Sequence, residues 1–304
     1  MKNDLTNELE KFIDIVGDRN ALQKKYLKTI MINLQEDEIE SLVSLIGFYE
    51  NRGYSISAIA ETYLLFIQVV MEETKYFAEH GEYRHHSFAE VSEDVYFDHE
   101  YMTKYMIGLA LSTYLLNFHL CSMRWFDSLI AGVTGNHYLE IGPGHGEYLY
   151  RAMRLAKMNS YTAVDLSPAS IEMTKKYIEY RMPTHTEVNC EYLCKDFLDF
   201  DEKMKFDAIV MGEVLEHVEK PELFLQKISH IASQDAFIYV TTVINAPERD
   251  HIFLFHNYKE IEELVQTTGL HVSDYRLITH NNKTLEKVIQ RREPILVAMM
   301  LKKD

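Results

Sequence analysis

Apolar residues in the first part of the chain recur at helical spacing. They fall at intervals of three or four residues in three groups, which are Leu5 to Val16, Ile39 to Ile46, and Ile56 to Val70. Interruptions at Gly17, at Gln35 to Asp37 and at Gly53 separate these groups. A polar stretch over residues 79–94 follows, and then a long apolar segment from about Asp98 to Ile130. The pattern predicts an all-helical N-terminal region with short antiparallel helices and one long final helix.

From residue 136 the pattern changes to short runs rich in β-branched residues, alternating with amphipathic helical segments. The runs are His137–Ile141, Tyr161–Leu166, Val188–Leu193, Phe206–Met211, Ala236–Ile244, Leu270–Ile278 and Ile295–Leu301. Prolines directly after Ser167 and Lys220 mark helix starts. This alternation predicts an α/β fold with a mostly parallel sheet, closed by the last two strands as an antiparallel hairpin. We place the boundary between residues 1–130 and residues 131–304.

Composition narrows the class of protein. The 304 residues include 31 Lys and Arg against 47 Asp and Glu, a net charge of −16, and 47% are hydrophobic. A packed globular protein is expected, and nucleic acid is a disfavoured partner because such binding depends on basic residues. The three cysteines, Cys121, Cys190 and Cys194, are too few for a disulfide framework. The most apolar stretch, Met106 to Cys121, is too short to span a bilayer, so no membrane and a cytoplasmic location are expected.

The segment between the first predicted strand and its helix contains Gly142, Gly144 and Gly146. Glycines at alternate positions let the backbone turn sharply and approach a ligand closely. A dinucleotide fingerprint needs a third glycine where Glu147 stands, which weakens an NAD-binding interpretation. Asp165 ends the next strand, 19 residues after Gly146, where a carboxylate can accept hydrogen bonds from both ribose hydroxyls.

Four segments in sequence order resemble the class I S-adenosylmethionine-dependent methyltransferases. They are Glu140 to Gly146, Asp165, Asp196-Phe197, and Phe206 to His217. The run from Gly212 to Phe224 looks like the branch that includes ubiquinone-pathway O-methyltransferases and many natural-product enzymes. The resemblance covers residues 131–304, and it implies a Rossmann-like, mostly parallel seven-stranded sheet that binds S-adenosylmethionine.

The resemblance assigns a set of residues to the cofactor, namely Glu140, Gly142, Gly144, Gly146, Asp165, Leu166, Asp196, Phe197 and Glu213. Glu140 would support the glycine loop, whose glycines would line the methionine moiety. Asp165 would hold the ribose, and Asp196 would accept from the exocyclic amine of adenine. For Phe197, burial in the core is an equally good interpretation.

Glu213, Glu216 and His217 have a spacing that would place them on one face of a helical turn, at the sheet edge where a methyl acceptor binds. Some metal-dependent relatives use a similar Glu-x-x-Glu-His set with a further histidine, for which His251 is the candidate. Three interpretations remain. The set binds Mg²⁺, Mn²⁺ or iron, or His217 or His251 is a general base, or these residues only shape the edge of the site.

The helical region before the sheet would then cover the active site. Tyr96, Phe97, Tyr101 and Tyr105 could line an apolar acceptor pocket, although an aromatic stripe is more often part of a core. The earlier helices could form a homodimer interface or dock a carrier protein. The leading function is O-methylation of a small molecule or carrier-bound metabolite in secondary metabolism. Metal-dependent RNA 2′-O-methylation and a non-catalytic cofactor-binding scaffold are the alternatives.

Overall fold

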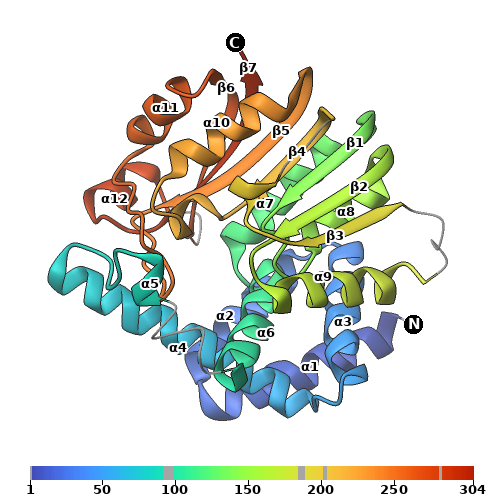
Figure 1. Ribbon diagram of the computed structural model, residues 1–304. Coiled ribbons are helices and arrows are strands. Elements are labelled where there is room, and N and C mark those ends of the chain that lie inside the picture. The colour runs from blue at the N-terminus through green and yellow to red at the C-terminus, as the bar shows by residue number, and fades with distance from the viewer. Residues whose placement is uncertain (1, 92–98, 184–188, 201–203, 281–282) are drawn as a thin grey trace.

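The computed structural model describes residues 2–91, 99–183, 189–200, 204–280 and 283–304 (Figure 1), with the backbone alone for residues 2–6 and 99–102. The part before the sheet is helical, as predicted. Its helices are α1 (Lys2–Arg19), α2 (Ala21–Asn33), α3 (Glu36–Asn51), α4 (Ile56–His80), α5 (Phe88–Val91), α6 (His99–Leu115) and α7 (Asn117–Ile130).

Two expected helix boundaries in this region are wrong. Gly17 lies inside α1, and the chain breaks instead at Asn20, whose side chain caps α2 by accepting the N–H of Gln23 at 3.1 Å. The long helix expected from Asp98 to Ile130 is two helices, α6 and α7, which meet at 68°. Leu116 is extended at this bend, and the hydroxyl of Tyr26 accepts the N–H of Asn117 at 3.3 Å. Tyr26, from a helix distant in the sequence, therefore stabilises a break that no local glycine or proline indicates.

Seven strands form one sheet in the order β3-β2-β1-β4-β5-β7-β6. They are β1 (Thr134–Ile141), β2 (Lys157–Asp165), β3 (Cys190–Cys194), β4 (Phe206–Gly212), β5 (Ala232–Ile244), β6 (Leu270–Thr279) and β7 (Ile295–Lys303). Strands β1 to β5 run parallel, whereas β7 pairs antiparallel with both β5 and β6. The predicted α/β fold with an antiparallel C-terminal hairpin is confirmed.

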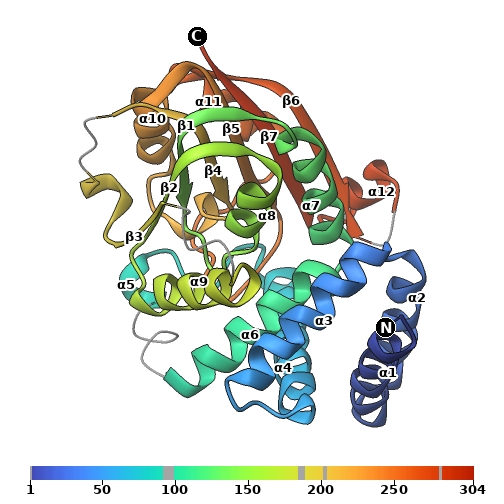
Figure 2. The ribbon, with the colours of Figure 1, turned by 90° about the vertical axis from the view of Figure 1, so that its right-hand side faces the viewer.

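Helices cover both faces of the sheet, so side chains on both faces of its strands are buried. On β1, for example, Tyr138 packs into one apolar cluster and Leu139 into the other. Figure 2 shows α7 and α8 on one side of the sheet and α10 and α11 behind it. The helices after β1 are α8 (Glu147–Leu155), α9 (Pro168–Arg181), α10 (Pro221–Ile231), α11 (Tyr258–Gln266) and α12 (Leu285–Gln290).

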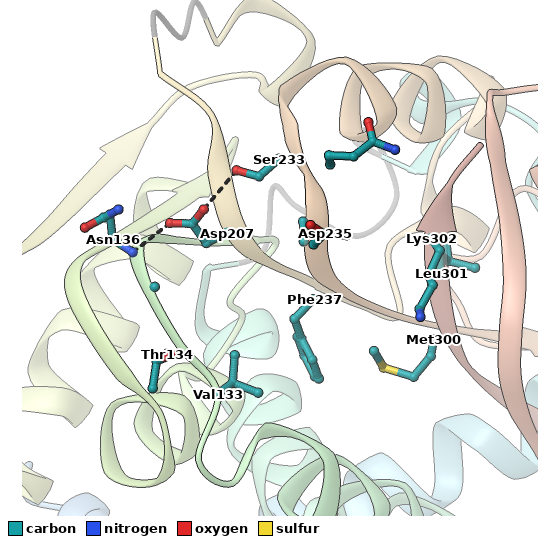
Figure 3. A pocket seen from close by; sticks show the side chains of 13 residues that line it. Val133, Thr134, Asn136, Asp207, Ser233, Asp235, Phe237, Met300, Leu301 and Lys302 are labelled. Carbon is teal, nitrogen blue, oxygen red and sulfur yellow. Dashed lines mark hydrogen bonds between the residues drawn. The ribbon is translucent and has the colours of Figure 1, made fainter.

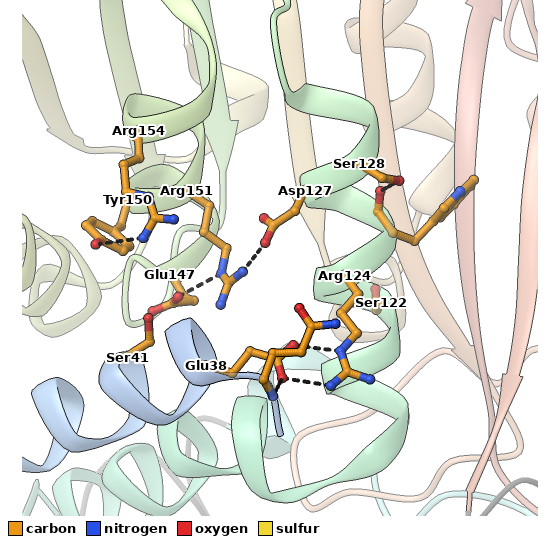
Figure 4. Close-up of polar contacts among 12 residues, drawn as sticks. Glu38, Ser41, Ser122, Arg124, Asp127, Ser128, Glu147, Tyr150, Arg151 and Arg154 are labelled. Atoms are coloured by element: carbon orange, nitrogen blue, oxygen red, sulfur yellow. Dashed lines mark hydrogen bonds and ion pairs between the residues drawn. The ribbon is translucent and has the colours of Figure 1, made fainter. Parts of the chain in front are cut away.

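Ion pairs fix the helical region against these covering helices (Figure 4). Arg124 of α7 donates to both carboxylate oxygens of Glu38 on α3, at 2.6 and 2.7 Å. Arg151 of α8 donates to Asp127 of α7 and to Glu147 at the start of its own helix. Helix α7 also packs against β6 and β7, so the layer that covers the sheet begins before the boundary we placed at residue 130.

A search of the described residues for membrane-spanning helices found no single helix of sufficient length and apolar character. Two bent helix pairs, residues 36–51 with 56–80 and residues 103–115 with 117–130, meet the length and composition test only when each pair is taken together.

Candidate functional site

The glycine loop joins β1 to α8 at the carboxyl edge of the sheet. Gly142, Gly144 and Gly146 have φ values of 65°, 56° and 88°, in the region that L side chains rarely adopt. A Cβ on Gly142 would lie 2.6 Å from the side chain of Val214, whereas a Cβ on Gly144 would meet no atom within 4 Å. The backbone at Gly144 therefore faces space that a ligand can fill.

Glu140 lies directly beneath this loop and is 1% exposed. Tyr138 donates its hydroxyl proton to one carboxylate oxygen at 2.7 Å, and the other oxygen, Oε1, is buried with no hydrogen-bond partner. Burial raises the pKa of Glu140 to about 8. Buried polar atoms are usually hydrogen-bonded. The unpaired Oε1 of Glu140 is therefore open to a hydrogen bond from a ligand bound at the glycine loop.

The next strand, β2, ends at Asp165. This carboxylate accepts the N–H of Ser167 at 2.8 Å and the hydroxyl of Ser170 at 2.6 Å, and burial raises its pKa. Leu166 beside it is 53% exposed. An oriented acid beside an exposed apolar side chain fits a ribose and its base, and the assignment of both residues to the cofactor stays a prediction.

Asp196 and Phe197 follow β3. Asp196 caps a short 3₁₀ turn, η2 (Phe197–Asp199), by accepting the N–H of Leu198 at 2.8 Å. Phe197 is 4% exposed, and its ring centroid lies 5.4 Å from that of Phe224. The structure therefore places Phe197 in the core, the alternative that we considered equally good.

Glu213 follows β4 and does not belong to the helical turn expected for it. Its φ is 53°, and its N–H donates to the carbonyl and the hydroxyl oxygen of Thr241 at 3.1 and 3.0 Å. The 3₁₀ turn η3 (Leu215–His217) begins two residues later. The carboxylate of Glu213 points to His119 of α7, with 3.6 Å between Oε2 and Nε2. Burial raises the pKa of Glu213, but His119, His251 and His217 outweigh it and leave the pKa below its usual value.

Glu216, His217 and His251 form a second group, and their ligand atoms all lie within 4.8 Å of one another. Glu216 is fully buried. Its Oε2 accepts the hydroxyl proton of Thr242 at 2.8 Å, and its Oε1 has no partner. Burial raises the pKa of Glu216 to about 8. Of the four residues that the resemblance groups as metal ligands, three come together and Glu213 lies outside the group.

The two imidazoles of this group are held in the same way. Nδ1 of His217 lies 3.1 Å from the carbonyl of Asp250, and Nδ1 of His251 lies 2.7 Å from the carbonyl of Ala246. A carbonyl only accepts, so each Nδ1 carries the proton and each Nε2 carries the lone pair. This is the arrangement of metal-ligating histidines. With the unpaired Oε1 of Glu216, these residues fit a divalent cation of the Mg²⁺, Mn²⁺ or iron class.

Several polar residues of this edge were missed by the sequence analysis. His119 and the pair Glu248 and Asp250 all approach the candidate residues, and Glu248, Asp250 and His251 also have ligand atoms within 4.8 Å of one another. Thr113 of α6 lies 3.2 Å from Nε2 of His145, inside the glycine loop. None of them belongs to a motif. For Thr113 and His119, the available signal was that these polar residues interrupt the apolar segment that forms α6 and α7.

The expected aromatic lining is described only in part. Tyr96 and Phe97 lie outside the described residues, and for Tyr101 only the backbone, in α6, is described. Tyr105 is 3% exposed and donates its hydroxyl proton to Glu248 at 2.7 Å. Burial raises the pKa of Glu248 to about 7. Tyr105 therefore supports an acidic side chain of the site from behind.

Two hollows of the surface lie away from this edge. One, of about 580 Å³, opens at the amino ends of β1, β4 and β5 (Figure 3). Its Asp207 already accepts the N–H of Asn136 at 2.6 Å and the hydroxyl of Ser233 at 2.9 Å. The other, of about 570 Å³, lies between η2 and α10. Parallel sheets bind ligands at the carboxyl ends of their strands, so we assign the site to the edge with the glycine loop.

Comparison with known proteins identifies the family of the segment that contains this edge. Residues 139–238 match the methyltransferase domain family. The chain is 25% identical to the (S)-tetrahydroprotoberberine N-methyltransferase of Eschscholzia californica over 129 residues, 42% of this chain and 34% of that protein. It is 20% identical to the ubiquinone biosynthesis O-methyltransferase of Nitrosomonas europaea over 126 residues, 41% of this chain and 52% of that protein. The chain thus spans about a third to a half of the length of these relatives.

A solved structure extends the likeness in fold beyond the matched segment. The mitomycin 7-O-methyltransferase superposes with a TM-score of 0.53 at 12% identity, covering 82% of this chain and 72% of that chain. The strand order, the glycine loop and the family match agree with one another. The chain carries a methyltransferase domain of the class I S-adenosylmethionine-dependent family.

Proposed function

We propose that this protein transfers a methyl group from S-adenosylmethionine to an oxygen atom of a small molecule or carrier-bound metabolite. The observation that carries the proposal is the meeting, at one sheet edge, of a bare glycine loop and a cluster of acidic and imidazole side chains. The bound cofactor supplies an electrophilic methyl on a sulfonium. The chain's own task is to bind the acceptor in line with that methyl, exclude water and take up a proton.

The choice of oxygen is supported by the groups that can accept a proton at this edge, because a hydroxyl must lose its proton when it is methylated. The ubiquinone relative is named as an O-methyltransferase, whereas the plant relative is named as an N-methyltransferase. A nitrogen acceptor is therefore the alternative within the same function. Secondary metabolism as the context, a cytoplasmic location, and a homodimer or carrier-docking role for the first helices stay predictions.

The proposal is tested with methyl-labelled S-adenosylmethionine and a panel of phenols, catechols and amines. Labelled product and S-adenosylhomocysteine should form together in equal amounts. The Glu213→Gln variant should lose turnover, and Glu172→Gln, which changes an exposed carboxylate on α9, is the matched control. Binding of S-adenosylhomocysteine without methylation of any acceptor would favour the scaffold alternative.

A divalent cation held by Glu216, His217 and His251 is the second element that we propose. It is favoured by the unpaired Oε1 of Glu216 and by the two carbonyl-bound Nδ1 atoms. A cation there would polarise an acceptor oxygen. Manganese titrated into chelator-treated protein should bind with one site per chain, and His251→Ala should abolish that site. Full methyltransferase activity after exhaustive chelation would leave the imidazoles as proton acceptors only.

RNA 2′-O-methylation is the remaining enzymatic alternative, suggested by the resemblance of these residues to metal-dependent relatives. The net charge of −16 opposes it. Filter binding to single-stranded RNA at moderate salt should show little retention. Tight, salt-dependent retention would favour the RNA substrate over a small molecule.

A further inference from the structure

We infer that His119, which the helical region contributes from α7, is the base that takes the proton from the methyl acceptor, with Glu213 as its partner. The inference rests on the proposed methyl transfer and names a residue outside the matched methyltransferase segment. Its basis is a chain of three side chains, Ser112, His119 and Glu213, which links the bend between α6 and α7 to the end of β4.

The first link fixes the tautomer of His119. Ser112 donates its hydroxyl proton to the carbonyl of Leu109 at 2.6 Å. Its oxygen lies 2.9 Å from Nδ1 of His119, and since the hydroxyl proton is already used, the oxygen accepts from Nδ1–H. The lone pair of the neutral ring is therefore on Nε2, the nitrogen that faces Glu213.

The second link is not a direct hydrogen bond. Nε2 of His119 and Oε2 of Glu213 are 3.6 Å apart, too far for a direct hydrogen bond but close enough for one hydroxyl to reach both. The Glu213 side chain is 30% exposed and that of His119 only 8%, so the pair opens to solvent on the carboxylate side. The left-handed backbone of Glu213, held by Thr241, aims the carboxylate at this point.

The proton balance of the step follows from these positions. The acceptor oxygen forms a bond to the methyl carbon, and the bond from that carbon to sulfur breaks, with its electron pair going to sulfur. The acceptor proton moves to Nε2, and the resulting imidazolium faces the carboxylate of Glu213. Burial lowers the pKa of His119, but Glu213 and then Glu248 outweigh burial and raise it, so the imidazolium formed in this step is stabilised.

The bend between α6 and α7 makes this arrangement possible. It turns Ser112 back onto His119, while the adjacent Thr113 contacts His145 of the glycine loop. A straight helix would place residues 112 and 119 two turns apart along one face, beyond hydrogen-bond reach. The same bend thus brings the helical region against the cofactor loop and supplies the proton acceptor.

The test uses 4-nitrocatechol, an acidic catechol whose anion absorbs at longer wavelength than its neutral form. Protein saturated with S-adenosylhomocysteine should convert bound 4-nitrocatechol to the anion at a pH where the free compound is neutral. His119→Asn should reduce the anion signal at least about tenfold and slow methylation of this probe by about a hundredfold. The affinity for S-adenosylhomocysteine, measured by calorimetry, should not change.

Two further variants keep the result interpretable. Ser112→Ala retains the imidazole but removes the acceptor of Nδ1–H, and a partial loss of anion signal is expected even if His119→Asn does not fold. His271→Asn removes another histidine that pairs with a carboxylate, Asp304, at 2.8 Å on the exposed strand β6, and should leave the signal unchanged.

Three outcomes would count against the inference. The first is an anion signal that persists in a folded His119→Asn variant, and the second is the absence of anion in the wild-type protein with S-adenosylhomocysteine bound. Either result overturns only the role of His119 and leaves the proposed methyl transfer standing. Failure of the wild-type protein to bind S-adenosylhomocysteine overturns the proposed methyl transfer and this inference with it.

Discussion

Glu147 is the side chain whose replacement should weaken the fold most clearly. It is 1% exposed and starts α8 directly after Gly146. Its Oε1 accepts from the hydroxyl of Tyr114 at 2.5 Å and from Nε of Arg151 at 2.8 Å, and its Oε2 accepts from the hydroxyl of Tyr177 at 2.6 Å. One carboxylate thus joins α6 of the helical region to α8 and α9.

Glu147→Gln keeps the shape of the side chain but replaces an acceptor oxygen by a donor. One of the tyrosine hydroxyls loses its acceptor, and Arg151 keeps only Asp127 as its carboxylate partner. Hydrogen bonds to a charged group contribute about 1.5–3 kcal/mol each. Breaking a buried ion pair from one side costs about 3–5 kcal/mol. We therefore expect the free energy of unfolding to fall by about 3 kcal/mol, a large part of a typical domain's stability.

Urea denaturation measures this change, with far-UV circular dichroism and the fluorescence of Trp125, the single tryptophan, as probes. The midpoint should fall while the slope stays the same. Glu172→Gln, which removes an exposed ion pair with Lys176 on α9, should leave the urea midpoint nearly unchanged. A loss below about 1 kcal/mol in Glu147→Gln would refute the argument that this carboxylate holds the regions together.

The pKa of Glu147 also predicts how the stability of the fold changes with pH. Burial raises the pKa of Glu147, but Arg151, Arg181 and the tyrosine hydroxyls outweigh it and hold the pKa below the usual 4.5. The stability from this lowered pKa is present above pH 4.5 and is lost as the pH falls through the folded-state value. The wild-type protein should therefore lose stability below pH 4.5 more steeply than Glu147→Gln, and parallel slopes would contradict this.

Three further predictions concern the cofactor edge. Asp165→Ala should weaken S-adenosylmethionine binding by at least about 1.5 kcal/mol in calorimetry, because it removes a charged hydrogen-bond acceptor, and equal affinity would disprove the ribose assignment. Because the pKa of Glu140 is raised to about 8, the ligand-free wild type should lose stability as the pH rises from about 4.5 to 8. Thermal melts at a series of pH values should show this loss, and Glu140→Gln should not show it. Gly142→Ala, whose Cβ would lie 2.6 Å from Val214, should lower the melting temperature more than Gly144→Ala, which should mainly reduce cofactor affinity; the reverse order would contradict the loop geometry.

The sheet was predictable because its strands are buried on both faces. Such strands read as short, nearly continuous apolar runs, and all seven runs correspond to strands of the sheet. The glycine loop was also predictable, because its strand, glycines and helix follow one another within a short segment of the chain. Strand ends were less accurate, and β5 begins at Ala232 rather than Ala236.

The break at Leu116 was not predictable from its own sequence. Neither glycine nor proline stands there, and the contact that stabilises it comes from Tyr26, which is 91 residues away along the chain. The conformation of Glu213 was missed for a related reason, since its N–H is held by Thr241 of the neighbouring strand. Spacing alone placed Glu213 with Glu216 and His217, and tertiary contacts separated them.

These two misses concern the same place, because the bend brings His119 to Glu213. The match to the methyltransferase domain family spans residues 139–238, and so it covers Glu213 but not Ser112 or His119. The two ends of the proposed proton path thus lie in different parts of the chain, with the strand end inside the family match and the helices outside it. The family match therefore gives no information on the residues of α6 and α7 that we propose to act on the acceptor.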